Sequence, residues 1–138
     1  MRKLIASASV STCMAMVWLA AARGGQAGAR GKDLFERRCS GCHAMDQDKE
    51  GPRLRGVYGR TSGAIPSFHY SDGLRKARII WDDAALDKWL AGPDKLVPDN
   101  DMGFHLEKAD ERAEIIAYLK QISGKSTGSP DSAEIPRR

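Results

Sequence analysis

The chain has 138 residues, the length of a single domain, and carries 22 Lys and Arg residues against 18 Asp and Glu residues. Arg2, Lys3 and Arg23 are the only charged residues before residue 28, so the remainder holds 19 basic and 18 acidic residues, a net charge of +1. Because this balance provides no basic stripe for a phosphate backbone, we expect no nucleic-acid partner.

The first 27 residues have the layout of a secretory signal peptide. Arg2 and Lys3 precede an apolar run from Leu4 to about Ala22, and small residues follow. A retained membrane anchor is the alternative. Hydroxyl residues interrupt the run, whereas a spanning helix needs about 20 mostly apolar residues. We therefore expect cleavage near residue 27 or 29, export to the periplasm and no stable membrane anchor.

Three helices are predicted in the mature chain. Residues 31–43, "GKDLFERRCSGCH", indicate a short helix that runs into a pair of cysteines. In "WDDAALDKWLAGP", Asp82 suits the N-cap, apolar residues recur at helical spacing, and Gly92-Pro93 ends the helix. The third segment, "ADERAEIIAYLKQI", has acids in its first turn and an apolar stripe.

Two long loops separate these helices. Residues 50–74 are rich in Gly, Pro, Ser and Arg, and residues 94–108 form a second loop that contains a single methionine. We place one domain at residues 28–123 and a flexible polar tail at 124–138. Three modest helices offer little apolar surface to bury. The domain therefore needs a further source of stability, and a large bound apolar cofactor would provide it.

The pair Cys39 and Cys42 allows three interpretations: a thioredoxin-like redox couple, half of a zinc site, or an anchor for haem. A zinc site needs four ligands, and His69 and His105 form no second pair. A redox couple belongs after a strand, and the sequence predicts none. Haem attachment requires C-x-x-C-H, which is present because His43 follows Cys42 directly. Attachment of haem outside the bacterial inner membrane also agrees with an exported chain.

The iron's second ligand is chosen by elimination. Met45 is tethered beside His43 and cannot easily reach the other face of the ring. Met102 is far along the chain in a loop, free to reach that face. His69 and His105 are rivals, but a lone histidine is more often a surface residue. We take Met102, and a His/Met pair raises the potential and leaves no open coordination position.

The chain resembles a class I cytochrome c of the mitochondrial-like, bacterial electron-carrier type. The resemblance covers roughly residues 31–122 and rests on "GKDLF…CSGCH", "GPRLRGVYGR", "FHYSDG", "IIWDDAALDKWLAGP", "P-x-x-x-M-x-F" and "ERAEIIAYLK", in the family's order and spacing. It implies an all-α cytochrome c fold, with about three to five short helices and long loops around one covalently bound haem c.

The resemblance also implies roles for individual residues. The carbonyl of Pro52 would accept the Nδ1–H of the proximal histidine. Partners for the haem propionates would be Arg60, Tyr70, Trp81 and Asn100, the last in place of the family's threonine. Gly31, Phe35, Ile115 and Tyr118 would form the contact between the first and last helices.

Several residues depart from the family pattern. Asp99 and Asp101 replace a glycine and a lysine beside Met102, and Asp94 replaces a lysine near the exposed haem edge. Trp89 stands where a tyrosine commonly bonds the ligand sulfur, so that bond is expected to be altered or lost. In this family a ring of lysines near the exposed haem edge steers the carrier to acidic docking sites on its partners. Because two of these lysines are replaced here, the family's partners cannot be assigned directly to this chain.

We interpret the chain as a monomeric periplasmic carrier of single electrons, not an enzyme, in a respiratory or other electron-transfer chain. Its expected partners are redox proteins: membrane cytochrome complexes, a terminal oxidase or reductase, or a periplasmic dehydrogenase. Two alternatives stay open. One is a haem subunit dedicated to a dehydrogenase, and the other is a haem sensor or enzyme in which the methionine is displaceable.

Overall fold

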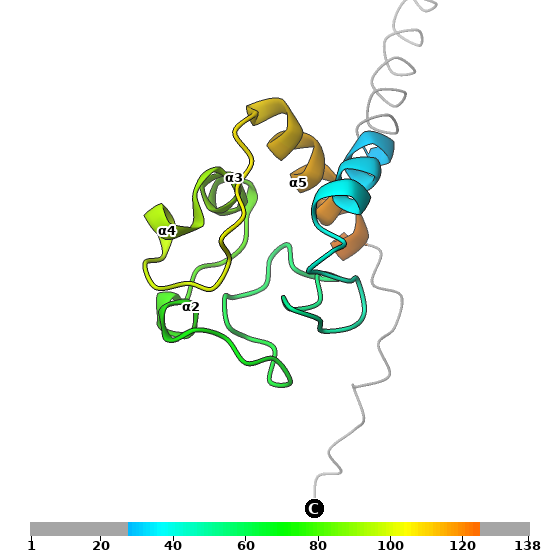
Figure 1. Cartoon of the computed structure of the whole chain (residues 1–138). Coiled ribbons are helices and arrows are strands. Elements are labelled where there is room, and N and C mark those ends of the chain that lie inside the picture. Colours follow the sequence, from blue (N-terminus) through cyan, green and yellow to red (C-terminus); the bar gives the residue numbers. More distant parts are fainter. Residues whose placement is uncertain (1–27, 125–138) are drawn as a thin grey trace, which may run out of the picture.

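The computed structural model describes residues 28–124, and the regular structure in this range is helical (Figure 1). One helix covers residues 28–38, and it is followed by α2 (Asp72–Ala77), α3 (Asp83–Ala91), α4 (Pro93–Leu96) and α5 (Ala109–Gly124). Residues 28–124 contain no strand, only an isolated antiparallel bridge between Thr61 and Ile80. The all-α fold class is therefore confirmed. The predicted signal peptide, and all of the predicted tail except Gly124, lie outside the described residues.

Two of the predicted helices form where their capping residues place them. The Asp82 carboxylate accepts a hydrogen bond from the backbone N–H of Ala85 at 2.8 Å, and Gly92 ends α3. Helix α5 begins at Ala109, with acids in its first turn. The first helix ends at residue 38 and so runs into the cysteine pair as predicted, and the two cysteines lie in the turns that follow.

The structure has two short helices where the sequence predicts loops. Helix α2 is capped by Ser71, but none of its six residues is buried, so no apolar periodicity marks it. Helix α4 has four residues and starts with Pro93 in its first turn, a position that tolerates the missing N–H. Both elements are too short for a periodic pattern to reveal. No helix in residues 28–124 is long and apolar enough to cross a membrane.

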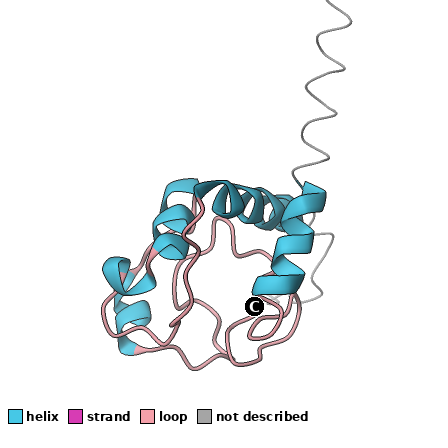
Figure 2. Cartoon of the chain, turned by 45° about the horizontal axis from the view of Figure 1, so that its top comes forward, coloured by secondary structure: helices cyan, strands magenta, loops and turns pink. Residues whose placement is uncertain are grey.

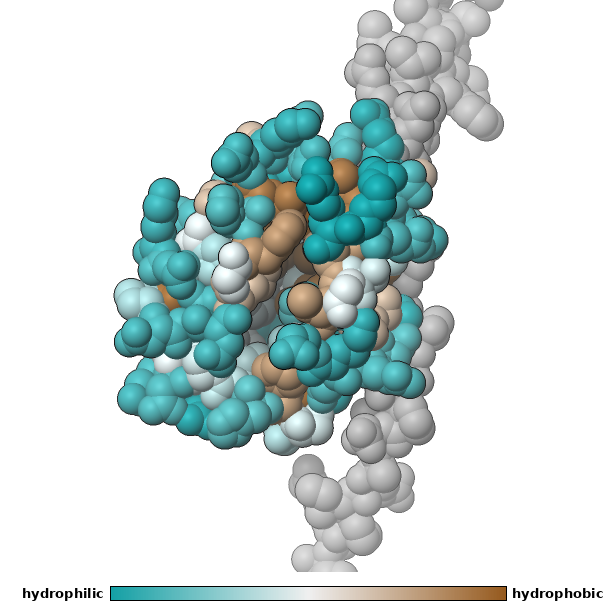
Figure 3. Space-filling model, viewed as in Figure 1, coloured by the Kyte–Doolittle hydropathy of each residue, from teal (hydrophilic) through white to brown (hydrophobic). Residues whose placement is uncertain are grey.

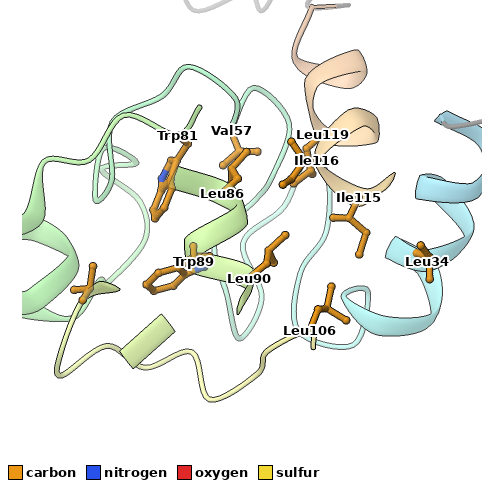
Figure 4. Packing of buried hydrophobic residues seen from close by; sticks show 11 residues of the cluster. Leu34, Val57, Trp81, Leu86, Trp89, Leu90, Leu106, Ile115, Ile116 and Leu119 are labelled. Atoms are coloured by element: carbon orange, nitrogen blue, oxygen red, sulfur yellow. The ribbon is translucent and has the colours of Figure 1, made fainter. Parts of the chain in front are cut away.

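The core joins α3 to α5 and continues to the helix at residues 28–38 (Figure 4). Trp81 and Trp89 lie against each other, with 5.4 Å between ring centroids. The Arg112 side chain fastens α5 to its neighbours, since its Nε donates to Asp87 at 2.7 Å and its Nη1 donates to two backbone carbonyls. Figure 2 shows the helices at the periphery and the long loops running between and below them. The buried cluster consists of Leu34, Val57, Trp81, Leu86, Trp89, Leu90, Val97, Leu106, Ile115, Ile116 and Leu119.

The helix at residues 28–38 approaches α5 closely at Gly31. A Cβ atom on Gly31 would overlap the carbonyl oxygen of Glu114 and lie 2.7 Å from the Cβ of Tyr118. One turn further on, the rings of Phe35 and Tyr118 pack with centroids 5.8 Å apart. The backbones of the two helices can approach each other this closely because residue 31 has no side chain.

Gly31→Ala should therefore lower the free energy of unfolding by about 1–3 kcal/mol, the usual cost of overpacking a tight contact. Denaturant unfolding of the purified protein measures this change. Gly124→Ala is the matched control, because a Cβ there meets nothing within 4 Å. Equal stability of the two variants would contradict the close approach.

Candidate functional site

A cavity of about 380 Å³ lies among the loops and the inner faces of the helices. This volume falls in the range of protein ligand pockets, roughly 300–1,000 Å³. Figure 3 shows its opening as a hollow bordered largely by apolar side chains. Eight of the nine site residues inferred from the sequence line it: Cys39, Cys42, His43, Pro52, Arg60, Tyr70, Trp81 and Met102.

A tight turn brings both cysteines and the histidine to the cavity. The backbone N–H of Cys39 donates to the carbonyl of Phe35 at 2.8 Å, and that of His43 donates to Cys39 at 2.8 Å. Neither cysteine takes part in a disulfide within residues 28–124; Cys42 is exposed and Cys39 is partly buried. Burial raises the pKa of Cys39 to about 11, with a smaller contribution from Cys42.

The His43 ring is oriented by its neighbours. Its Nδ1 lies 2.8 Å from the carbonyl oxygen of Pro52. Because a carbonyl oxygen only accepts, Nδ1 carries the hydrogen and Nε2 keeps its lone pair for a ligand bond. Burial lowers the pKa of His43, the Pro52 carbonyl raises it, and Lys49 lowers it further. A Cβ on Gly51 would overlap the imidazole, so this neighbour must be glycine.

The sulfur of Met102 has its own hydrogen bond. The indole Nε1–H of Trp89 donates to Met102 Sδ at 3.1 Å. The sequence predicts that this bond is altered or lost where tryptophan replaces tyrosine. The structure keeps the bond, because an indole N–H and a phenol O–H both donate and the sulfur needs only a donor. A thioether keeps a further lone pair for a metal when one is used in this way.

Arg60, Tyr70 and Trp81 form a polar edge of the cavity. The Arg60 guanidinium donates to the carbonyls of Arg53 and Arg55 at 3.0 and 3.1 Å. Among residues 28–124 it has no carboxylate partner, and burial lowers its pKa. Burial also raises the pKa of Tyr70, with Arg60 opposing. A cationic group left in such surroundings is suited to an anionic group of a ligand.

Asn100 is the inferred site residue that does not line the cavity. Its amide nitrogen donates to Asp94 at 2.8 Å and to the Val97 carbonyl at 2.9 Å, which uses both of its hydrogens. Its oxygen accepts the backbone N–H of Met102 at 2.8 Å. Its contact with a propionate stays a prediction, and the structure gives it a different set of partners.

The other candidate iron ligands differ in whether they line the cavity. Met45 and His105 do not line the cavity, whereas His69 does, with its side chain exposed. The sequence did not single out Leu54, Leu74 or Phe104 as lining residues. The first and last of these lie in loops and Leu74 in the short α2, so no periodicity could show which side chains point inward.

The donor set fits haem c. A C-x-x-C-H turn supplies two thiols and an imidazole, a methionine sulfur reaches the same cavity, and the polar edge suits two carboxylates. In residues 28–124, no three or more His, Cys, Asp or Glu side chains gather as a metal site. The class defined by this fold and site is an all-α protein with covalently attached haem.

Comparisons with known proteins identify the family. The family model for cytochrome c matches residues 28–123. A cytochrome c of Euglena viridis is 46% identical over 96 residues, which cover 67% of this chain and 94% of that protein. A cytochrome c of Chlamydomonas reinhardtii is 41% identical over 99 residues, covering 69% and 88%. The structure of cytochrome cH from Methylobacterium extorquens has a TM-score of 0.65 and 38% identity, covering 68% of this chain and 97% of that one.

The chain thus belongs to the cytochrome c family. It is a class I cytochrome c, it carries one covalently bound haem c, and it is an electron carrier that works with redox proteins. The zinc and thioredoxin-like interpretations of the two cysteines are thereby set aside, and the haem interpretation is confirmed.

Gly51→Ala should disturb the orientation of His43, since the added methyl overlaps the ring. We expect a loss of stability of about 1–3 kcal/mol from overpacking, together with a changed absorption spectrum of the haem. Optical spectroscopy and denaturant unfolding of the holoprotein measure both effects. Gly41→Ala lies between the cysteines in open space and serves as the control. Normal spectra in both variants would show that residue 51 does not constrain the histidine.

Proposed function

We propose that this chain is an exported, periplasmic carrier of single electrons, with His43 and Met102 as axial ligands and Cys39 and Cys42 as the thioether links. It would serve a respiratory or other electron-transfer chain and would not itself be an enzyme. One observation carries the proposal. An imidazole and a thioether from distant parts of the chain reach one cavity, and each is held by a hydrogen bond of its own.

The bound haem supplies the redox chemistry, since its iron accepts and releases one electron. The protein's contribution would be to hold the iron from both sides, with His43 and Met102 as the donors. Pro52 fixes the ring of His43, and Trp89 fixes the sulfur of Met102, so neither donor has to move when the charge on the iron changes. A site filled by the protein on both sides favours electron transfer over the binding of a gas or peroxide.

The polar edge of the cavity would hold the haem propionates. Arg60, Tyr70 and Trp81 all face the cavity, and Arg60 brings a positive charge that has no carboxylate partner in residues 28–124. A buried carboxylate is costly unless it is paired or hydrogen-bonded, so these three side chains would offset the cost of burying the acidic edge of the porphyrin.

The residues at the opening would form the docking face for redox partners. The charges there are mixed, because Arg38 lines the cavity together with Glu50 and Asp101. Phe104 adds apolar surface, with 37% of its area exposed. Partner association should therefore depend less on salt than it does for a carrier with a ring of lysines.

The alternative function, a haem sensor or enzyme, requires a displaceable methionine. The bond from Trp89 to the Met102 sulfur favours the carrier, because it adds to the cost of moving the methionine away. His69 is the remaining rival ligand, since its side chain also reaches the cavity.

Met102→Ala should open the iron, lower the reduction potential and allow the ferrous protein to bind carbon monoxide. His69→Ala is the matched test of His69 as the iron ligand. This variant should keep the wild-type potential and bind carbon monoxide poorly. Redox titration and carbon monoxide titration measure both variants. If His69→Ala opens the iron and Met102→Ala does not, the ligand assignment is wrong. If the wild-type protein binds carbon monoxide as tightly as Met102→Ala does, the sensor or enzyme is favoured.

Export and assembly state can be read from the mass of the purified holoprotein. Gly28 is buried beside Gln121, so cleavage after residue 27 would keep this contact, whereas cleavage after 29 would remove it. We expect the periplasmic fraction to contain a form that starts at Gly28 and carries one haem. Its native mass should be that of a monomer. A stable complex with a dehydrogenase would favour the dedicated-subunit alternative, and retention of residues 1–27 would contradict export with cleavage.

A further inference from the structure

The loop that carries Met102 contains a polar contact that the proposed function does not use. Asn100 makes three hydrogen bonds with its side chain, and all three partners lie between residues 94 and 102. Its Nδ2 donates to Asp94 Oδ1 at 2.8 Å and to the Val97 carbonyl at 2.9 Å, and its Oδ1 accepts from the Met102 N–H at 2.8 Å. We call these three bonds the Asn100 brace.

One end of the Asn100 brace is anchored in the core. Asp94 follows the buried Pro93 in the first turn of α4, and Val97, which is 3% exposed, ends that helix. The Val97 N–H donates to the Pro93 carbonyl at 2.8 Å. Helix α2 closes the other side, because a Cβ on Gly73 would lie only 2.5 Å from the Pro98 carbonyl oxygen and 3.0 Å from a Val97 methyl.

The other end of the Asn100 brace is the main chain of Met102. An asparagine oxygen that accepts the N–H two residues on forms a local turn that fixes the backbone between them. The turn follows directly on Asp99, whose φ of 59° is in the left-handed region. Trp89 holds the sulfur of the same methionine from α3. The backbone and the side chain of Met102 are therefore held by separate groups.

We infer that Asn100, held by Asp94, is a positioning residue for the axial methionine. Asn100 fixes the main chain from which the Met102 side chain extends, and Asp94 fixes Asn100 by accepting one of its two amide hydrogens. Asp94 and Asn100 both depart from the family pattern, and the structure joins them in one contact. The inference rests on the proposed function, since it takes Met102 as a ligand.

Removing the Asn100 brace should let the loop open more often, so that an external ligand competes better with the methionine. The probe is imidazole added to the ferric holoprotein. We expect Asn100→Ala and Asp94→Ala to bind imidazole roughly tenfold more tightly than the wild type, the upper end of the value of one net hydrogen bond. The long-wavelength absorption band of sulfur–iron ligation should also be lost at a lower temperature.

Two further variants separate the hydrogen bond from charge. Asp94→Asn removes the charge but keeps an oxygen that can accept from Asn100, so it should bind imidazole within about twofold of the wild type, well below one net hydrogen bond. Asp99→Asn removes one negative charge from the same loop, and asparagine tolerates the left-handed backbone there. It should also behave like the wild type. Denaturant unfolding of all four variants checks that any change in imidazole affinity exceeds the change in global stability.

The results distinguish the inference from the proposed function. If Met102→Ala leaves the spectrum and ligand binding unchanged, the proposed ligand itself is wrong. If Met102→Ala opens the iron but Asn100→Ala and Asp94→Ala match Asp99→Asn, the inference alone is overturned. It is also overturned if Asp94→Asn behaves like Asp94→Ala, because charge would then explain the effect. Asp94 is exposed, so its variants are expected to fold even if Asn100→Ala does not.

Discussion

The buried hydrophobic cluster of the structure packs around a cavity. The inner faces of α3 and α5 contribute Leu86, Trp89 and Leu119 to the same cavity that holds Cys39 and Met102. A domain of this size buries a modest fraction of its surface, and its helices alone cannot supply a full interior. The haem c of this family is therefore part of the core, and folding and cofactor binding share the same apolar contacts.

Because the cavity is enclosed by loops, its geometry is set by hydrogen bonds and close approaches more than by regular structure. The Pro52 carbonyl turns the His43 ring, and Gly51 leaves room for that ring. Gly31 likewise leaves room for the close approach of the first and last helices. At each of these glycines a methyl group would overlap a neighbour, so backbone positions distant from one another in the sequence are fixed by the absence of a side chain.

The sequence predicted those parts of the fold that a short pattern determines. The Asp82 cap, the apolar stripe of α5 and the C-x-x-C-H motif from Cys39 to His43 each depend on residues a few positions apart. Helices α2 and α4 were not predicted, because their few residues carry no apolar periodicity. The sequence could not place Asn100 either. Whether its amide turns toward a propionate or toward Asp94 is decided by tertiary contacts, which residue identity does not encode.

The replacements around Met102 are connected by chemistry rather than by position. A lysine at residue 94 could not accept a hydrogen bond from the Asn100 amide, whereas an aspartate can. A threonine at residue 100 lacks the second donor that reaches the Val97 carbonyl. Asp94 therefore accepts a bond that a lysine could not accept, and Asn100 makes one more donation than a threonine could make. The same aspartate reverses the local charge where redox partners are expected to dock. Any gain in the order of the ligand loop is thus tied to a change in the partners that this face can attract.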